Sequence, residues 1–220
     1  MFESHIDIAF IYQENPETSL SRILNVLDTT GEYDYTKLSS DEILLDDELN
    51  GCSIILGDRE RHLFQYNDDI IKFIIQCENL TWSSDGRERL GAAFSFVTYV
   101  YAHTDPQYVF GMHDWRAERI PKDPDEFDYA LPSPITDEGL AQNWINHPTW
   151  LMIFPPELVE VYGREWLLNL PAETVEELDD GAIMTVATES ILDCQSDTEI
   201  AQEIGDAMEP IEQRFQQRDI

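Results

Sequence analysis

Histidine and carboxylate side chains, which can bind a metal ion or perform acid–base catalysis, occur together at one place in this chain. The stretch AHTDPQYVFGMHDW, residues 102–115, has His103 and Asp105 at one end and His113 and Asp114 at the other. A zinc site needs its ligands close in space, presented by one face of a helix or by one hairpin. The element between the two histidines therefore decides whether they can act together.

That element is predicted to be a strand that holds the histidines apart. The segment PQYVFGMHDW, which starts at Pro106, is rich in aromatic and β-branched residues. His103 and His113 would lie up to about 30 Å apart in a fully extended chain. The tripeptide His103–Asp105 is typical of a turn that leads into a strand. Because no third ligand and no HExxH or HxH pattern is nearby, we expect a structural junction, with no metal ion and no cofactor.

Sequence patterns of other catalytic sites are absent. The chain has no GxSxG nucleophile elbow, P-loop, dinucleotide fingerprint or DxDxDG calcium loop. Adjacent carboxylates are frequent, as at 46–48, but in so acidic a chain they arise by chance and do not indicate a glycosidase. We expect a protein that is not an enzyme and has no catalytic residues. A metal-dependent enzyme that uses His103 and His113 is the least favoured alternative.

The charge of the chain is strongly negative. It has 45 Asp and Glu against 13 Lys and Arg, a net charge of −32, and the acidic residues are spread along the whole sequence. Two explanations remain open: a basic partner that docks on an acidic face, or adaptation to molar salt, where the Debye length is about 3 Å and self-repulsion is screened. The scarcity of lysine favours salt adaptation. No basic stripe is present to neutralise phosphates, so no nucleic-acid partner is expected.

Length and composition are typical of a globular protein. The 220 residues, 42% of them hydrophobic, are enough for a substantial core. No apolar run reaches the roughly 18 to 20 residues that span a bilayer, and the first residues lack the basic segment of a signal peptide. The cysteines Cys52, Cys77 and Cys194 are far apart and are expected to be reduced thiols. We therefore expect a cytoplasmic protein that does not bind membranes.

The order of the predicted elements indicates the fold class. β-branched and aromatic residues predict strands at 5–13, 51–57, 106–115, 149–155 and 181–190. Helices are predicted at 15–31, 156–171 (one helix or a pair), 172–180 (a helical turn) and 196–218; the segment 39–49 is a helical candidate, and 89–105 fits a helix or a strand, with the helix favoured. The segment 68–80 fits either type. We expect an α+β fold: a single domain over 1–195 with a mixed or antiparallel sheet flanked by helices, and a C-terminal amphipathic helix over 196–220 that packs on it or on a partner.

A candidate binding surface lies in the segment 121–148, which holds five of the eleven prolines and is predicted to be a long surface loop. Prolines lower the entropy lost on docking, aromatic side chains can anchor in a partner's pocket, and carboxylates set orientation. The alternative is a solvated loop whose aromatic residues pack back on the core. The predicted partner-binding residues are Asp123, Asp125, Glu126, Phe127, Asp128 and Tyr129.

A longer pattern runs through the second half of the chain. Trp150 and Leu151 open an apolar strand, a helical segment follows with Gly163 near its middle, and a later strand opens after Gly181. This pattern, with the preceding FSFVTYVYAHTDPQYVFGM, resembles the type VI secretion immunity protein family over about residues 86–193. The resemblance implies an α+β protein without catalytic residues, which neutralises a toxin by binding it.

Two classes of function are open at this point. In the first the chain is an immunity protein whose partner is a toxin. In the second it is a structural or assembly component, for example of a virus particle or an injection machine from a halophile. The partner is another protein in both cases, and the sequence fixes neither its identity, nor the oligomeric state, nor the binding face.

Overall fold

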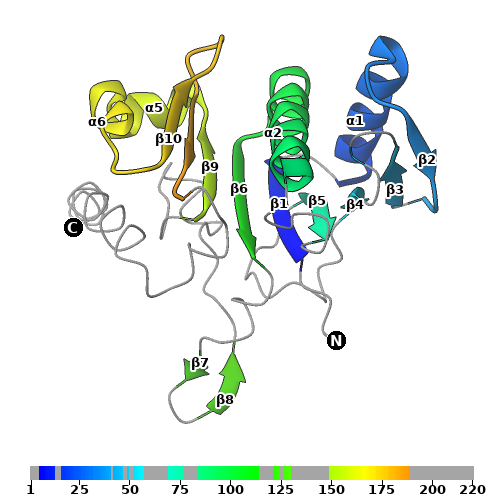
Figure 1. Ribbon diagram of the computed structural model, residues 1–220, viewed down its shortest axis with the longest axis horizontal. Coiled ribbons are helices and arrows are strands. Elements are labelled where there is room, and N and C mark those ends of the chain that lie inside the picture. The colour runs from blue at the N-terminus through cyan, green and yellow to red at the C-terminus, as the bar shows by residue number, and fades with distance from the viewer. Residues whose placement is uncertain are drawn as a thin grey trace. The chain divides into compact units, whose positions relative to one another are not determined.

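The computed structural model describes residues 5–12, 16–40, 42–46, 49, 52–56, 69–76, 84–113, 121–123, 126–129 and 149–188. Within these ranges the chain forms antiparallel sheets with helices, which confirms the predicted α+β class (Figure 1). The helices of these ranges include none that is long and apolar enough to cross a membrane. The predicted boundary at 195 and the predicted helix at 196–218 lie outside the described residues.

Chain contacts divide the protein into two compact units, which are described separately. Unit 1 consists of Met1–Arg61 and Asp68–Gln107, and unit 2 of His62–Asn67 and Tyr108–Ile220. Each unit has its own buried apolar residues and its own strands and helices.

Unit 1 is built on an antiparallel run of strands in the order β1-β5-β4-β3-β2. The strands are β1 (His5–Tyr12), β2 (Tyr35–Lys37), β3 (Glu42–Leu45), β4 (Cys52–Leu56) and β5 (Asp69–Gln76). The strands predicted at 5–13 and 51–57 are confirmed. The segment 68–80, which fitted a helix or a strand, forms β5 and pairs with β1 from end to end.

The helix predicted at 39–49 is wrong, because β3 occupies its centre. Ile43 and Leu45 are fully buried, whereas Glu42 and Leu44 are half-buried, which is the period-two pattern of a strand. The backbone of β3 pairs with β2 on one side and β4 on the other. These ladder hydrogen bonds outweigh the helix propensity of the acidic and leucine residues.

Helix α1 (Pro16–Thr30) confirms the predicted helix and its end. Leu20, Ile23 and Leu27 follow a helical spacing and are all buried. Gly31 ends the helix with a φ of 62°, and its N–H donates to the Leu27 carbonyl at 2.9 Å. A positive φ at this position suits glycine, which has no Cβ to clash with the backbone.

Helix α2 (Ser84–Thr104) confirms the helix predicted at 89–105. Phe96 on α2 meets Phe73 of β5 with ring centroids 4.9 Å apart, and Tyr33 contacts the edge of Phe96 at 4.9 Å. Helix α1 packs on β4 and β5 and also lies beside α2. The two helices therefore cover the same face of the unit 1 strands (Figure 1).

Unit 2 contains antiparallel strands in the order β10-β11-β9-β6. They are β6 (Tyr108–His113), β9 (Leu151–Phe154), β10 (Thr174–Glu177) and β11 (Ile183–Val186). The strands predicted at 106–115, 149–155 and 181–190 are confirmed. Every residue of β9 and β11 is buried, so these two strands form the centre of the unit 2 core.

The segment 156–171, predicted as one helix or a pair, is a pair. Helix α5 (Pro156–Tyr162) and helix α6 (Arg164–Leu168) meet at Gly163, where φ is 97° and ψ is 119°. Tyr162 packs against Phe154 of β9, with ring centroids 5.8 Å apart. The chain changes direction at Gly163, so that α5 packs on β9 while α6 packs on β10 and β11.

The helical turn predicted at 172–180 is wrong, because Thr174–Glu177 is strand β10. Its four residues pair in register with β11, from Thr174 opposite Val186 to Glu177 opposite Ile183. Gly181 closes the connecting turn with a φ of 90°, and its N–H donates to the Leu178 carbonyl at 2.9 Å. Pairing with a neighbouring strand outweighs the helix propensity of the glutamates.

Candidate functional site

The predicted partner-binding segment contains a β-hairpin where a loop was predicted. Strand β7 (Pro121–Asp123) and strand β8 (Glu126–Tyr129) pair with each other in a two-stranded antiparallel sheet of their own. Five of the six predicted residues lie on these strands: Asp123, Glu126, Phe127, Asp128 and Tyr129. The sixth, Asp125, and the remainder of the predicted loop, 130–148, lie outside the described residues.

The hairpin brings the two ends of the predicted patch next to each other. Asp123 stands opposite Glu126, and Pro121 stands opposite Tyr129. Along β8 the sequence alternates acidic and aromatic residues, from Glu126 to Tyr129. The patch, which the sequence indicates only by its composition, therefore lies on two paired strands.

His103 and His113 belong to different elements. His103 lies in the last turn of α2, so the turn predicted to begin there is wrong, and His113 is the last residue of β6. The left-handed position that ends the helix falls at Asp105, with a φ of 52°. Across the described ranges, no group of three or more His, Cys, Asp or Glu side chains is placed to hold a metal ion.

A buried hydrogen-bond chain forms the junction after α2. The Thr104 hydroxyl donates to the Val100 carbonyl at 2.6 Å, so in its 2.7 Å contact with Tyr12 the tyrosine hydroxyl is the donor. Burial raises the pKa of Tyr12 well above its usual range. The bond between Tyr12 and Thr104 joins β1 to the end of α2, and burial keeps the Tyr12 hydroxyl neutral.

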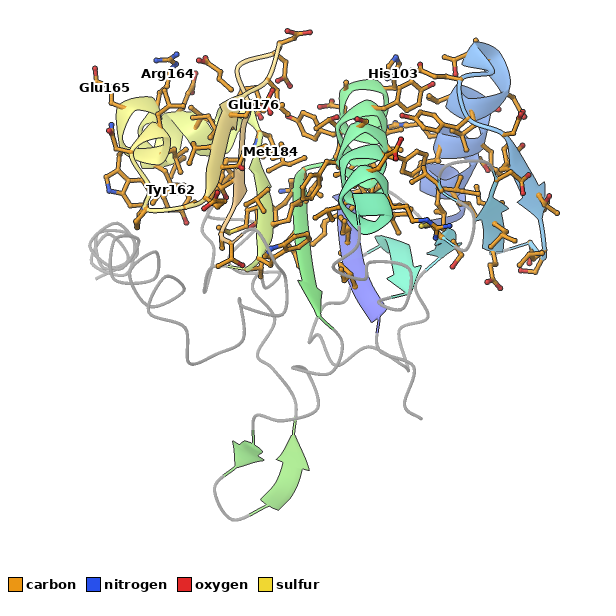
Figure 2. All side chains as sticks on the ribbon, viewed as in Figure 1. His103, Tyr162, Arg164, Glu165, Glu176 and Met184 are labelled. Atoms are coloured by element: carbon orange, nitrogen blue, oxygen red, sulfur yellow. The ribbon has the colours of Figure 1, made fainter. Side chains whose placement is uncertain are left out.

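A groove of about 470 Å³ lies beside this junction, between α1 and α2. It is lined by Ser21, Arg22, Asn25, Val26, Thr29, Thr30 and His103. Figure 2 shows His103 at the end of α2, on the side where α1 lies. The sequence alone does not single out these residues of α1, because their only signal is an arginine among polar residues on the outer face of an amphipathic helix.

A second groove of unit 1, of about 420 Å³, has the opposite character. It is lined by Glu32, Tyr33, Asp34, Asp46, Leu49, Ala92 and Ser95. Its three carboxylates come from the segment after α1 and from the residue after β3. Among the lining residues that the structure describes, this groove has no basic residue and the groove between α1 and α2 has no carboxylate.

The described surface of unit 2 is acidic. Between residues 149 and 188 there are eight carboxylates, all exposed, and one basic residue, Arg164. Arg164 forms an ion pair with Glu177 of β10, and this hydrogen bond raises the pKa of the arginine and lowers that of the glutamate. Figure 2 shows Arg164 and Glu165 on α6, and Glu176 on β10. The exposed carboxylates give this unit a strongly negative face.

The residues that carry the family resemblance have structural roles. Trp150 is buried, and its Nε1 donates to the Thr188 carbonyl at 3.0 Å. Leu151 is the first residue of β9. Gly163 and Gly181 occupy backbone conformations with positive φ. These four positions define strands and turns, and none of them supplies a reactive group.

Comparison with known proteins gives one likeness. No protein-family model matches the chain, and no curated protein matches it. Among solved structures, the chain is similar to the T6SS protein PA0821 of Pseudomonas aeruginosa, with 12% sequence identity and a TM-score of 0.42. The alignment covers 95% of this chain and 73% of the other. Membership of the immunity family stays a proposal.

Proposed function

We propose that this chain is a non-enzymatic protein that acts by binding another protein, and that the β7–β8 hairpin is part of its binding surface. The observation that carries the proposal is the hairpin itself. Its strands pair only with each other among the described strands, and along β8 acidic residues alternate with aromatic ones. A paired backbone is preorganised, which lowers the entropy lost on docking.

The two kinds of residue on β8 suit two parts of recognition. Phe127 and Tyr129 provide the kind of aromatic side chain that anchors protein interfaces. Glu126 and Asp128 would set orientation and attract a basic surface. The exposed carboxylates of unit 2 add a longer-range attraction for the same kind of partner at low ionic strength. The partner of this proposal is accordingly a protein with a basic face, such as a toxin that acts on nucleic acid.

Immunity is the specific role that we propose, since it accords with the resemblance of the second half of the chain. It predicts that a gene next to this one encodes a protein that arrests growth when expressed alone. Co-expression of this chain should restore growth, and the two proteins should copurify. If the neighbouring genes instead encode particle or tail components that copurify with this chain without any toxicity, the assembly role replaces immunity.

The hairpin is tested with two charge-matched variants. The first carries Asp123→Asn, Asp125→Asn, Glu126→Gln and Asp128→Asn, and keeps both aromatic residues. The control removes four exposed carboxylates elsewhere in unit 2, through Glu173→Gln, Glu176→Gln, Asp179→Asn and Asp180→Asn. Both variants change the net charge equally, so a difference between them reports position. Circular dichroism checks that both are folded.

The expected result is a larger loss of partner affinity in the hairpin variant than in the control, which loses only the long-range attraction. The difference should persist in molar salt, where long-range charge effects are screened and only directly paired acids contribute. Equal affinity of the parent and the folded hairpin variant would remove the hairpin from the binding surface. Restoration of growth would still test the immunity role separately.

A further inference from the structure

Strand β2 is the outermost strand of unit 1 (Figure 1). It pairs with β3 on one side, and the described part of the chain places no strand on its other side. Thr36 and Lys37 are exposed and Tyr35 is half-buried, so the strand lies at the surface. The outer edge of such a strand can pair with a strand from another chain.

The hydrogen bonds between β2 and β3 show which backbone groups point away from the sheet. The Leu38 N–H donates to the Glu42 carbonyl at 3.0 Å, and at the other end of β2 the Asp34 carbonyl accepts from the residue after β3, also at 3.0 Å. In an antiparallel ladder, residues that bond the neighbouring strand alternate with residues whose N–H and C=O point the other way. Tyr35 and Lys37 therefore each direct an N–H and a C=O away from β3.

These outward groups match what an added strand needs. Among the described residues, no hydrogen bond uses the N–H or C=O of Tyr35 or Lys37. The two residues are about 7 Å apart along the strand, which is the two-residue repeat at which a pairing strand presents its own donors and acceptors. Main-chain bonds supply affinity in this mode of binding, whereas side chains beside the edge supply selectivity.

The side chains beside this edge are acidic. The Thr36 hydroxyl donates to the Asp46 carboxylate at 3.2 Å, so this carboxylate lies next to the middle of β2. Asp34 directly precedes the strand and is exposed. Asp34 and Asp46 both line the groove of about 420 Å³, together with Glu32. Lysine or arginine side chains on an added strand would meet these carboxylates, which favours a basic occupant.

An apolar side chain lies at the other end of β2. Leu38 follows the strand and is 54% exposed, and it is the one large hydrophobic residue exposed to this degree among the residues that the structure describes. It offers an added strand an apolar contact beyond the backbone bonds.

We propose that the outer edge of β2 binds an extended basic segment of another protein as an additional strand. The segment would exchange backbone hydrogen bonds with Tyr35 and Lys37 and place basic side chains against Asp34 and Asp46. A second copy of this chain is a poorer occupant, because it would bring another charge of −32 to the same edge. The inference concerns unit 1 alone and does not depend on the β7–β8 hairpin.

The probe is a short capped peptide in which lysine alternates with valine, added to the full chain in molar KCl. Hydrogen exchange of single amides is followed by NMR. With saturating peptide, the Tyr35 and Lys37 amides should exchange about tenfold more slowly, as expected for one added hydrogen bond each. The Leu38 amide already donates within the sheet and should change little. Absence of protection at Tyr35 and Lys37, or equal protection by a peptide with glutamate in place of lysine, overturns the proposal.

Two variants of one residue separate the backbone from the side chain. Lys37→Pro removes an N–H that points away from β3, where an edge strand accepts proline, and Lys37→Thr removes the same lysine but keeps the N–H. The proline variant should bind the peptide about tenfold more weakly than the threonine variant, and equal binding by the two folded variants overturns the site. If the proline variant does not fold, a lysine peptide methylated on every backbone nitrogen replaces it. That peptide keeps its charge but cannot donate, and its binding to the parent as tightly as the unmethylated peptide overturns the site.

A second pair of variants tests the charge. Asp34→Asn with Asp46→Asn should weaken the lysine peptide several-fold, whereas Glu157→Gln with Glu160→Gln, exposed on α5, should change it little in molar salt. Equal weakening by both pairs overturns recognition of basic side chains at β2. Sedimentation of the parent tests the other occupant, since a dimer that Lys37→Pro dissociates would assign the edge to a second copy and overturn the proposal.

Discussion

Asp105 adopts a left-handed backbone conformation that is uncommon for residues other than glycine. It follows α2 with a φ of 52°, the only positive φ among the described residues other than glycine. Its N–H donates to the Tyr101 carbonyl at 3.2 Å, which closes the end of the helix. Aspartate tolerates this left-handed conformation better than most residues, but glycine adopts it without a steric cost.

This conformation predicts opposite effects for two small substitutions. Asp105→Gly should keep or raise the free energy of unfolding, whereas Asp105→Ala should lower it by about 1 kcal/mol. Urea unfolding measured side by side gives both values, with Glu160→Ala, exposed on α5, as a control that should change little. An alanine variant as stable as the glycine variant would show that the backbone is not strained at this residue.

Cys52 is a second residue with a measurable consequence. Burial raises the pKa of its thiol to about 11, although the charge of Arg89 lowers it in part. In the unfolded chain a thiol ionises above about pH 8.5–9. Protonation of Cys52 thus favours the folded state below that pH, and this contribution is lost as the pH rises towards 11.

We therefore expect alkaline destabilisation that depends on this thiol. Between about pH 8 and about pH 10 the free energy of unfolding should fall by about 1 kcal/mol from this group alone. Tyr12 and Tyr108 are buried neutral tyrosines with raised pKa values, and they add to the loss at higher pH. Urea unfolding of Cys52→Ala at the two pH values should show a smaller fall than the parent. An equal fall in both proteins would contradict the assignment.

At the scale of elements, Gly163 decides how α5 and α6 cover the unit 2 strands. A Cβ added there would meet no atom closer than 4.0 Å, so space is available. The backbone, with a φ of 97°, is what requires glycine. Gly163→Ala should lower the free energy of unfolding by about 1–2 kcal/mol. Thermal unfolding measures this change, with Gly91→Ala within α2 as the control. A Cβ at Gly91 would meet no atom within 4 Å, and alanine favours a helix more than glycine does, so the control should not lower the free energy of unfolding.

The elements also show where sequence patterns suffice and where they do not. The periodicity of α1 predicts its helix because its apolar residues face one core, whereas β1, which is buried on both faces from Ile8 to Tyr12, is predicted by its isoleucine and aromatic residues. Segments 39–49 and 172–180 contain glutamates and leucines, which favour helices in isolation. Both contain strands that pair with strands close in the sequence, β3 with β2 and β4, and β10 with β11, and this pairing outweighs local propensity.

The sequence also predicts the candidate sites only in part. The hairpin patch at 121–129 was found from its composition, although its strands were not. The sequence alone does not indicate the groove at Arg22 and His103, because these two residues are 81 positions apart and the contact of α1 with α2 brings them together. The ten-residue spacing of His103 and His113 was conspicuous in the sequence, yet the histidines lie on different elements.

At the scale of the whole molecule, charge is the dominant property. A net charge of −32 in 220 residues opposes the compact state through mutual repulsion. The segment 149–188 offers little local compensation, since Arg164 is its only basic residue and is already paired with Glu177. Exposed pairs of this kind contribute little to stability. Screening by salt is therefore the principal means by which the repulsion can be reduced.

We expect the folding of this protein to depend on high salt. At molar KCl the Debye length is about 3 Å, shorter than most separations between surface carboxylates, whereas at about 0.1 M it is roughly 10 Å and many of them repel one another. Dialysis between these conditions should unfold or loosen the protein, and circular dichroism through the dialysis measures it. Sodium sulfate at matched ionic strength separates screening from a specific requirement for potassium. A protein folded equally at both salt levels would rule out salt adaptation, and the acid would then be best explained by attraction to a basic partner.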